Sequence, residues 1–218
     1  EQNVVPGRVT KVMHSFSSAL CLSFEQSLSY ISPSKNTHVT GNPVRKSYIS
    51  EPKFQGFYDM VIPDLPVVLV FGGSQGAESL NRLFSNQYKF YLQSDLLLIH
   101  ITGPEHYNRY YKDQPFAIMR NEAYEPRVII FPYFDDMDTL YILSSVVVSR
   151  AGATTIAELL NYQKPAVLIP YPHAKDNHQV LNANAFCDSA QGIMIEEPDL
   201  TFETIQFQIN RLILMAAQ

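Results

Sequence analysis

The sequence predicts an α/β protein built on a parallel β-sheet with helices on both faces. From Pro66 onward, short runs of β-branched and apolar residues alternate with segments of helical periodicity, the pattern of repeated strand–helix units. The strand candidates are apolar almost throughout rather than alternating, which indicates that both of their faces are buried. Of the 218 residues, 46% are hydrophobic and 17% are charged, so the chain is able to form a sizeable core.

The elements are predicted from these two periodicities, strand by strand and helix by helix. The β-branched, apolar runs predict strands at Val67–Phe71, Leu96–Ile101, Val128–Phe131, Val146–Val148, Ala166–Ile169 and Ile193–Ile195. The segments between and after them have apolar residues at helical spacing and predict helices at Leu80–Tyr91, Glu105–Lys112, Met137–Leu143, Thr155–Tyr162, Gln179–Ala190 and Phe202–Met215. Residues 66–218 therefore form one nearly complete α/β domain.

The first part of the chain has too few elements to bury a core alone. It predicts strands at Lys11–Phe16, Leu20–Phe24 and His38–Thr40 and a short helix at Glu25–Ile31. Residues 46–65 mix polar residues with prolines and a glycine, which is typical of a linker. We expect residues 1–45 to be the tail end of another α/β unit.

The charge balance, the cysteine spacing and the hydropathy of the sequence argue against several classes of protein. Acidic residues (21) outnumber Lys and Arg (16), which argues against a general nucleic-acid binder but leaves room for a local phosphate pocket. Cys21 and Cys187 have no pairing or metal spacing and predict buried thiols of a reducing compartment. No apolar run approaches the roughly 18–20 residues that span a bilayer, and we see no signal peptide. The first residue is Glu1, not Met, which indicates a processed chain or a piece of a longer protein.

A glycine-rich turn follows the first strand of the main domain. The segment Gly72–Ala77 leads into a helix, so its backbone N–H groups and the helix dipole favour an anion such as phosphate. The segment matches neither the dinucleotide-binding fingerprint nor a P-loop. A tight turn that needs glycine conformations is the equal alternative.

Small residues recur at a second strand end, in the segment Ser149–Glu158. They let a ligand approach the start of a helix. Thr155 and Glu158 also have the spacing of a capping box, with Thr155 as N-cap. From the spacing alone, the cap is the favoured interpretation of Glu158.

Three further polar segments have structural and functional interpretations. Tyr171–Gln179 contains two histidines and an aspartate, but loop polarity before a helix is favoured over a metal site because no ligand spacing is present. Gln179 and Asn182 share one helix face.

Asp135 and Asp136 are predicted to be structural, as helix N-caps. Arg45, ending Gly41–Arg45, either reaches across a cleft toward a phosphate or lies at a surface turn.

Polar, glycine-bearing strand ends along one sheet indicate a nucleotide or sugar-nucleotide site. Together the segments Glu1–Asn3, Pro6–Gly7, Gly41–Arg45, Gly72–Ala77, Arg150–Thr155 and His178–Ala183 resemble the MurG family, the peptidoglycan N-acetylglucosaminyltransferases that convert lipid I to lipid II. The resemblance extends over nearly the whole chain, with the motifs in the family's order and approximate spacing.

The resemblance implies a GT-B architecture of two facing Rossmann-like domains. Residues 1–45 would be the C-terminal remnant of the acceptor-binding domain, 46–65 the linker and 66–218 the domain that binds the donor UDP-GlcNAc. The implied substrate-binding residues are Asn3, Arg45, Gly73, Ser74, Gln75, Phe134, Ala153, Thr154, Thr155, Ile156, Ala157, Glu158, Gln179 and Asn182. Their implied targets are the phosphates and sugar for Ser74 and Gln75, the uracil for Phe134, the ribose for Glu158 and the GlcNAc hydroxyls for Gln179 and Asn182. Asn3 and Arg45 would approach from the opposite wall.

The implied reaction is inverting transfer of GlcNAc to the C4 hydroxyl of lipid-linked MurNAc-pentapeptide, in cell-wall biogenesis, cell shape and division. Backbone amides stabilise the departing pyrophosphate, so no metal or other cofactor is expected. The implied partners are UDP-GlcNAc and lipid I, at the cytoplasmic face of the bacterial plasma membrane, where the protein would be peripheral. The family's glycine loop with its base and its apolar membrane patch would precede Glu1, so we expect donor binding without transfer.

Departures from the family pattern leave two alternatives. The family's Asn-Lys pair after Pro-Gly is Thr10-Lys11 here, no histidine precedes Glu1, and the chain ends at Gln218 where the family usually continues. One alternative is another GT-B UDP-sugar transferase that differs around Gln179 and Asn182. The other is a non-catalytic nucleotide-sugar-binding module. A dinucleotide-dependent oxidoreductase is disfavoured because no G-x-G-x-x-G occurs at a strand end.

Overall fold

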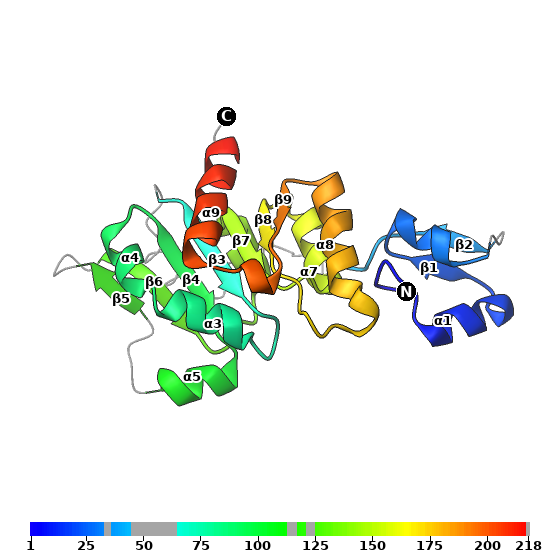
Figure 1. Cartoon of the computed structure of the whole chain (residues 1–218), viewed down its shortest axis with the longest axis horizontal. Coiled ribbons are helices and arrows are strands. Elements are labelled where there is room, and N and C mark those ends of the chain that lie inside the picture. The colour runs from blue at the N-terminus through cyan, green and yellow to red at the C-terminus, as the bar shows by residue number, and fades with distance from the viewer. Residues whose placement is uncertain (33–35, 45–64, 113–116, 121–124, 217–218) are drawn as a thin grey trace.

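A twisted sheet covered by helices on both faces forms the larger part of the chain, and a small N-terminal unit lies beside helix α8 (Figure 1). The computed structural model describes residues 1–32, 36–44, 65–112, 117–120 and 125–216. Within these residues, one sheet contains seven strands in the order β5-β6-β4-β3-β7-β8-β9. All neighbouring pairs are parallel except β5 with β6. The predicted parallel sheet is therefore confirmed, with an added antiparallel edge.

The elements follow one another as strand–helix repeats. The strands are β3 (Val67–Phe71), β4 (Leu97–Ile101), β5 (Ala117–Arg120), β6 (Glu125–Phe131), β7 (Val146–Ser149), β8 (Ala166–Leu168) and β9 (Gly192–Met194). The helices are α3 (Glu78–Ser85), α4 (Tyr88–Gln93), α5 (Pro104–Tyr110), α6 (Met137–Leu143), α7 (Ala153–Asn161), α8 (His178–Ser189) and α9 (Phe202–Ala216), with short 3-10 helices η4 (Lys175–Asn177) and η5 (Glu197–Asp199).

The central strand β3 is buried on both faces, as its unbroken apolar sequence predicts. Val68 and Val70 pack in the cluster that includes side chains of α3, α4 and α9. Leu69 and Phe71 pack in the cluster that includes side chains of α6, α7 and α8. Because β3, β7 and β8 run parallel, their carboxyl ends meet at one edge of the sheet. Three predicted strand ends are therefore brought together there.

Two predictions in the main domain differ from the structure. The single helix predicted over Leu80–Tyr91 is two helices, α3 and α4, separated at Asn86 and Gln87. Strand β5 was not predicted, and it pairs antiparallel with β6 through a register shift between Ile118 and Met119. Antiparallel edge strands are common on otherwise parallel sheets.

The N-terminal unit contains the clearest error. The strand predicted at Lys11–Phe16 is helical: α1 (Arg8–Met13) continues into η1 (His14–Phe16). Its apolar residues recur at i, i+3, i+4 and i+7, which is helical spacing. The other elements are β1 (Leu20–Leu22), η2 (Glu25–Tyr30) and β2 (Thr37–Val39), and β1 pairs parallel with β2. The predicted linker lies outside the described residues except for Leu65.

The two cysteines are free, but Cys21 is exposed rather than buried as predicted. It lies in the middle of β1, whose two-stranded sheet leaves it in solvent. Cys187 on α8 is half-buried, and burial raises the pKa of its thiol. In the part of the chain that the structure describes, no helix is long and apolar enough to cross a bilayer.

Candidate functional site

A cavity of about 960 Å³ opens where β3, β7 and β8 end. Four stretches distant in sequence supply its lining residues, within 72–86, 150–155, 171–179 and 197–200. This is the edge at which open α/β sheets bind ligands. The cavity therefore contains the glycine-rich turn, the start of α7 and the loop before α8, which are three of the five segments that the sequence analysis examined for ligand binding.

The glycine-rich turn combines two glycines in the left-handed region with an uncapped helix. Gly73 and Gly76 have φ values of 88° and 80°, and the N–H of Gly76 donates to the carbonyl oxygen of Gly73 at 3.0 Å. A Cβ on Gly76 would overlap the carbonyl oxygen of Thr102. Among the described residues, no side chain caps α3 at Ala77, so the first N–H groups of α3 remain available to an anion. Both interpretations of this segment, tight turn and phosphate cradle, fit its geometry.

A buried polar network supports the turn from behind. The amide of Asn81 donates to the carbonyl oxygen of Thr102 at 2.7 Å. Its oxygen lies 3.1 Å from Nε2 of His100, and Nδ1 of His100 lies 2.8 Å from the Tyr88 hydroxyl. This arrangement requires the Nε2–H tautomer, with Nδ1 accepting from Tyr88. Burial lowers the pKa of His100 to about 3, with the charge of His106 acting in the same direction, so the ring is neutral.

The neutral His100 makes a pH-dependent contribution to stability. Unfolded histidine titrates near about 6.5, whereas folded His100 stays unprotonated down to about 3. The unfolded state therefore binds the extra proton, and stability is fully present above about 6.5 and is lost as the pH falls toward about 3. At pH 5 the loss from this group is expected to be about 2 kcal/mol.

Urea unfolding at pH 7 and pH 5 measures this loss. The His100→Gln variant should show a smaller difference between the two pH values than the unchanged chain. The control is His38→Gln, because His38 is exposed on β2. An unchanged pH difference in His100→Gln would contradict the neutral, buried histidine.

Helix α7 starts earlier than predicted. Gly152 is its N-cap, without a side-chain hydrogen bond, and the helix begins at Ala153. Thr155 therefore lies in the first turn and lines the cavity. The capping box predicted for Thr155 and Glu158 is wrong, because residues before Thr155 already have helical conformation. Oε2 of Glu158 instead accepts a hydrogen bond from the Tyr141 hydroxyl at 2.8 Å.

Arg150, which the sequence did not single out, joins three walls of the cavity. Its guanidinium forms an ion pair with Glu197 at 3.0 Å and donates to Oγ of Ser79 at 2.9 Å. It also donates to the carbonyl oxygens of Ile169 and Pro170, after β8. Burial alone would raise the pKa of Glu197, but hydrogen bonds from Arg150 and Ser79 outweigh it and lower the pKa. Glu197 is therefore a carboxylate that balances the charge of Arg150.

The loop before α8 forms the remaining wall. Oε1 of Gln179 accepts from the N–H of Tyr171 at 2.9 Å, and both residues line the cavity with His173. Helix α8 begins at His178, one residue before the predicted start. Within the described ranges, no group of three or more His, Cys, Asp or Glu residues is placed to hold a metal ion.

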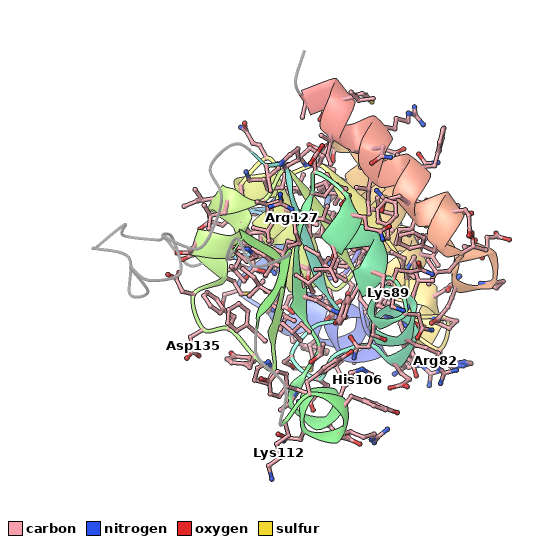
Figure 2. The ribbon with its side chains drawn as sticks, turned by 90° about the vertical axis from the view of Figure 1, so that its left-hand side faces the viewer. Arg82, Lys89, His106, Lys112, Arg127 and Asp135 are labelled. Carbon is pink, nitrogen blue, oxygen red and sulfur yellow. The ribbon has the colours of Figure 1, made fainter. Side chains whose placement is uncertain are left out.

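Other ionisable side chains lie at this end of the domain. Figure 2 shows Arg82 and His106 near α3 and α5, and Asp135 projecting from the loop after β6. Glu78 accepts from His106 at 3.2 Å and pairs with Arg82 at 3.5 Å. Asp136 caps α6 and accepts from the Thr139 hydroxyl at 2.6 Å, which confirms its predicted structural role.

A model of the glycosyltransferase family 28 C-terminal domain matches residues 67–218. The chain belongs to glycosyltransferase family 28. Two curated relatives are named UDP-N-acetylglucosamine–N-acetylmuramyl-(pentapeptide) pyrophosphoryl-undecaprenol N-acetylglucosamine transferase. The one from Crocosphaera subtropica is 34% identical over 98% of this chain and 57% of its own length. The one from Chlorobium phaeobacteroides is 37% identical over 92% of this chain and 52% of its own length. The chain thus spans about half of these relatives.

Solved structures agree on the fold of this family 28 chain. The crystal structure of Acinetobacter baumannii MurG is similar over 100% of this chain and 60% of its own, with a TM-score of 0.68 and 24% identity. The calicheamicin glycosyltransferase CalG4 matches 94% of this chain and 49% of its own, with a TM-score of 0.62 and 13% identity. The expected MurG resemblance and the GT-B, Rossmann-like fold class are confirmed.

The family 28 domain gathers some of the predicted substrate-binding residues around its cavity and leaves others apart. Gly73, Thr155 and Gln179 line it, and Ser74 and Gln75 lie exposed in the glycine-rich turn. The other predicted residues of α7 are Ala153, Thr154, Ile156, Ala157 and Glu158, of which Ile156 is fully buried and Thr154 is exposed.

Three predicted residues lie elsewhere in this family 28 chain, and one lies outside the described residues. The ring of Phe134 is buried beside Phe131, with 4.9 Å between centroids. Asn182 is buried and bonds to Asn3 at 3.1 Å. Arg45 is outside the described residues. Substrate contacts for these residues remain predictions.

The sequence did not single out the lining residues Glu78, Arg82, Arg150 and Glu197, and it pointed to His173 only as part of a metal site. Arg150 stood inside a segment that was noted for its small residues, and its position two residues after the predicted strand Val146–Val148 was the available signal. Glu197 had no such signal, because its partner Arg150 is 47 residues away.

Proposed function

We propose that this chain is the donor-binding part of an inverting N-acetylglucosaminyltransferase that transfers GlcNAc from UDP-GlcNAc to the C4 hydroxyl of a lipid-linked MurNAc-pentapeptide. The main support is the cavity itself, where the uncapped start of α3, the glycine-rich turn and Arg150 surround a space of about 960 Å³. Such a space is in the range of small-molecule sites. The names of the relatives support the sugar and the acceptor.

The donor's diphosphate would lie against the turn Gly73–Gly76 and the first N–H groups of α3. These groups stabilise the charge that develops as UDP departs. Gln179 is the proposed partner of the GlcNAc hydroxyls, with Ser74 and Gln75 beside the phosphates and sugar. Phe134 would provide backbone groups to the uracil, and Glu158 would bond the ribose.

The chemistry is a single displacement at the anomeric carbon. The C4 oxygen of the acceptor forms the new glycosidic bond while the bond from the anomeric carbon to the β-phosphate oxygen breaks. The electron pair leaves on UDP, and the hydroxyl proton passes to a base that we place outside this chain. Holding both substrates in line across a cleft supplies much of the rate gain. Charge on the leaving group is met by the backbone N–H groups of the turn and of α3, so we propose that no metal is required.

Residues 1–45 are proposed to be part of the acceptor-binding domain, with 46–65 as linker and 66–218 as donor-binding domain. The exposed apolar face of α1 and η1 supports this division: Val9, Val12, Met13 and Phe16 are 53–81% exposed. A two-stranded parallel sheet and an open apolar helix face need further chain to cover them. Arg45 and Asn3 would then face the donor from this side.

Because the proposed acceptor is lipid-linked, we propose that the complete protein acts at the cytoplasmic face of the bacterial plasma membrane, as a peripheral enzyme of cell-wall synthesis that affects cell shape and division. Two alternatives keep the same cavity: a transferase for another UDP-sugar, or a non-catalytic nucleotide-sugar-binding module. The first alternative predicts no preference for UDP-GlcNAc over another UDP-sugar. The second predicts no transfer of GlcNAc even by a longer protein that contains this chain.

Calorimetric titration of the chain with UDP-GlcNAc, UDP-glucose and ADP-glucose tests the proposal. We expect weak binding of UDP-GlcNAc, about tenfold tighter than the other two, which corresponds to about 1.4 kcal/mol. The affinity should be the same in EDTA and in Mg²⁺, and the chain should transfer no GlcNAc to lipid I. Equal affinity for all three sugar nucleotides would contradict the proposed specificity. Transfer by a longer protein containing this chain separates the enzyme from a binding module.

A further inference from the structure

Asn182 on α8 is fully buried, and its amide is occupied by protein partners. Its oxygen accepts the backbone N–H of Val4 at 3.0 Å. Its nitrogen donates to Oδ1 of Asn3 at 3.1 Å and to the carbonyl oxygen of Ala151 at 3.2 Å. Both N–H bonds of the amide are therefore used, one toward the N-terminal unit and one toward the start of α7.

The N-terminal segment that Asn182 contacts is held in shape by its own hydrogen bonds. The carboxylate of Glu1 accepts the backbone N–H groups of Gln2, Asn3 and Gly7 and the hydroxyl of Thr10. Burial acts to raise the pKa of Glu1, but these hydrogen bonds outweigh it and lower the pKa. The segment is thus a preformed loop that presents Asn3 and Val4 to α8.

Val4 extends the contact into the core of the larger domain. It is 3% exposed and belongs to the same buried cluster as Ala151 and Ala183. Ser27, which is fully buried, donates to the carbonyl oxygen of Asn3 at 3.3 Å. The contact therefore pairs a buried apolar side chain with satisfied buried hydrogen bonds, a combination that fixes geometry.

The two elements joined by Asn182 both reach the cavity. Gln179, one turn before Asn182 on α8, lines the cavity, and Ala151 directly precedes Gly152, which lines it as the N-cap of α7. A shift of Asn182 would move the start of α8 relative to the start of α7. Figure 1 shows the N-terminal unit beside α8, on the side of the sheet where α7 also lies.

We infer that Asn182 is a positioning residue, which ties the N-terminal unit to the starts of α7 and α8 and so holds the donor half-site in its binding geometry. The link to donor affinity rests on the proposed function. The link to the geometry of α7 and α8 does not. In this role the amide acts through backbone position rather than by contact with the ligand.

The experiment compares Asn3→Ala, Asn182→Asp and the control Asn184→Ala. Asn3→Ala removes one partner of Asn182 from outside the donor domain. Because Asn3 is also proposed to face the donor, the ligand-free exchange of this variant, and not its affinity, decides the positioning role. Asn182→Asp keeps the acceptor for Val4 but turns a second oxygen toward Asn3 and the carbonyl of Ala151. Asn184 is exposed on the same helix. Hydrogen exchange of the ligand-free chain is followed over residues 1–7, 151–156 and 178–183, and UDP-GlcNAc affinity is then measured by calorimetry.

Faster exchange is expected in all three stretches for Asn3→Ala and Asn182→Asp, with affinity about threefold weaker for the first and at least tenfold weaker for the second. Asn184→Ala should leave both readouts unchanged. If Asn3→Ala speeds exchange only in residues 1–7, the inference is overturned and the contact is an anchor alone. Absence of UDP-GlcNAc binding by the unaltered chain would instead contradict the proposed function, and the ligand-free exchange still decides the positioning role.

Discussion

Replacing Gly76 by alanine is expected to lower the free energy of unfolding by about 3 kcal/mol and to abolish donor binding. A left-handed φ costs a non-glycine residue about 1–2 kcal/mol, and Gly76 has a φ of 80°. The added Cβ would also overlap the carbonyl oxygen of Thr102, and such overpacking costs about 1–3 kcal/mol more. Relief of the overlap must displace the turn from the end of β4, which removes the proposed phosphate cradle.

Gly73→Ala is the matched control, because Gly73 has a similar φ of 88° but no atom within 4 Å of an added Cβ. It should cost only the conformational strain, about 1–2 kcal/mol. Urea unfolding of both variants separates strain from overlap, and UDP-GlcNAc titration of Gly76→Ala measures the loss of donor binding. Equal losses of stability in the two variants would show that contact with Thr102 has no part in shaping the turn.

Arg150→Ala is expected to cost about 2–3 kcal/mol of stability and at least tenfold in donor affinity. Its side chain is 11% exposed, and its partner Glu197 is 21% exposed. Removing one member of a largely buried ion pair leaves the other charge without compensation. The carbonyl oxygens after β8 and the hydroxyl of Ser79 lose their donor as well.

Arg82→Ala provides the comparison within the same cavity. Arg82 pairs with Glu78 on the surface of α3, where the two side chains are 73% and 52% exposed, so its loss should change stability by no more than about 0.5 kcal/mol. Thermal or urea unfolding with the same titration measures both variants. If Arg150→Ala proves as stable as Arg82→Ala, the ion pair with Glu197 does not hold the walls of the cavity together.

The main domain could be predicted from the sequence because each local pattern agreed with the global fold. An all-apolar strand such as Val67–Phe71 is compatible only with burial on both faces, and a parallel sheet provides it. The strand ends followed, since parallel strands bring their carboxyl ends to one edge. The sequence alone therefore places the glycine-rich turn, Thr155 and Gln179 near one another.

The errors arose where local pattern underdetermines structure. Helical spacing relates Val9, Val12, Met13 and Phe16, but the β-branched and aromatic side chains in this segment favoured a strand. Helix α1 has no buried residue among the described ones, so core packing does not distinguish a helix from a strand here. The early start of α7 depended on Gly152 adopting an extended cap conformation. Arg150 and Glu197 needed the tertiary fold to meet.

Strand order has a consequence for synthesis of the chain. β3 comes first in the sequence among the strands of its sheet, yet in the folded sheet it occupies the central position, between β4 and β7. Its second neighbour, β7, is made about 75 residues later, which at roughly 5–20 residues per second leaves one edge of β3 open for several seconds. An uncharged β-branched strand with an open edge is prone to aggregation. Pro66, directly before β3, and Gly72, directly after it, limit how far intermolecular pairing extends along the chain.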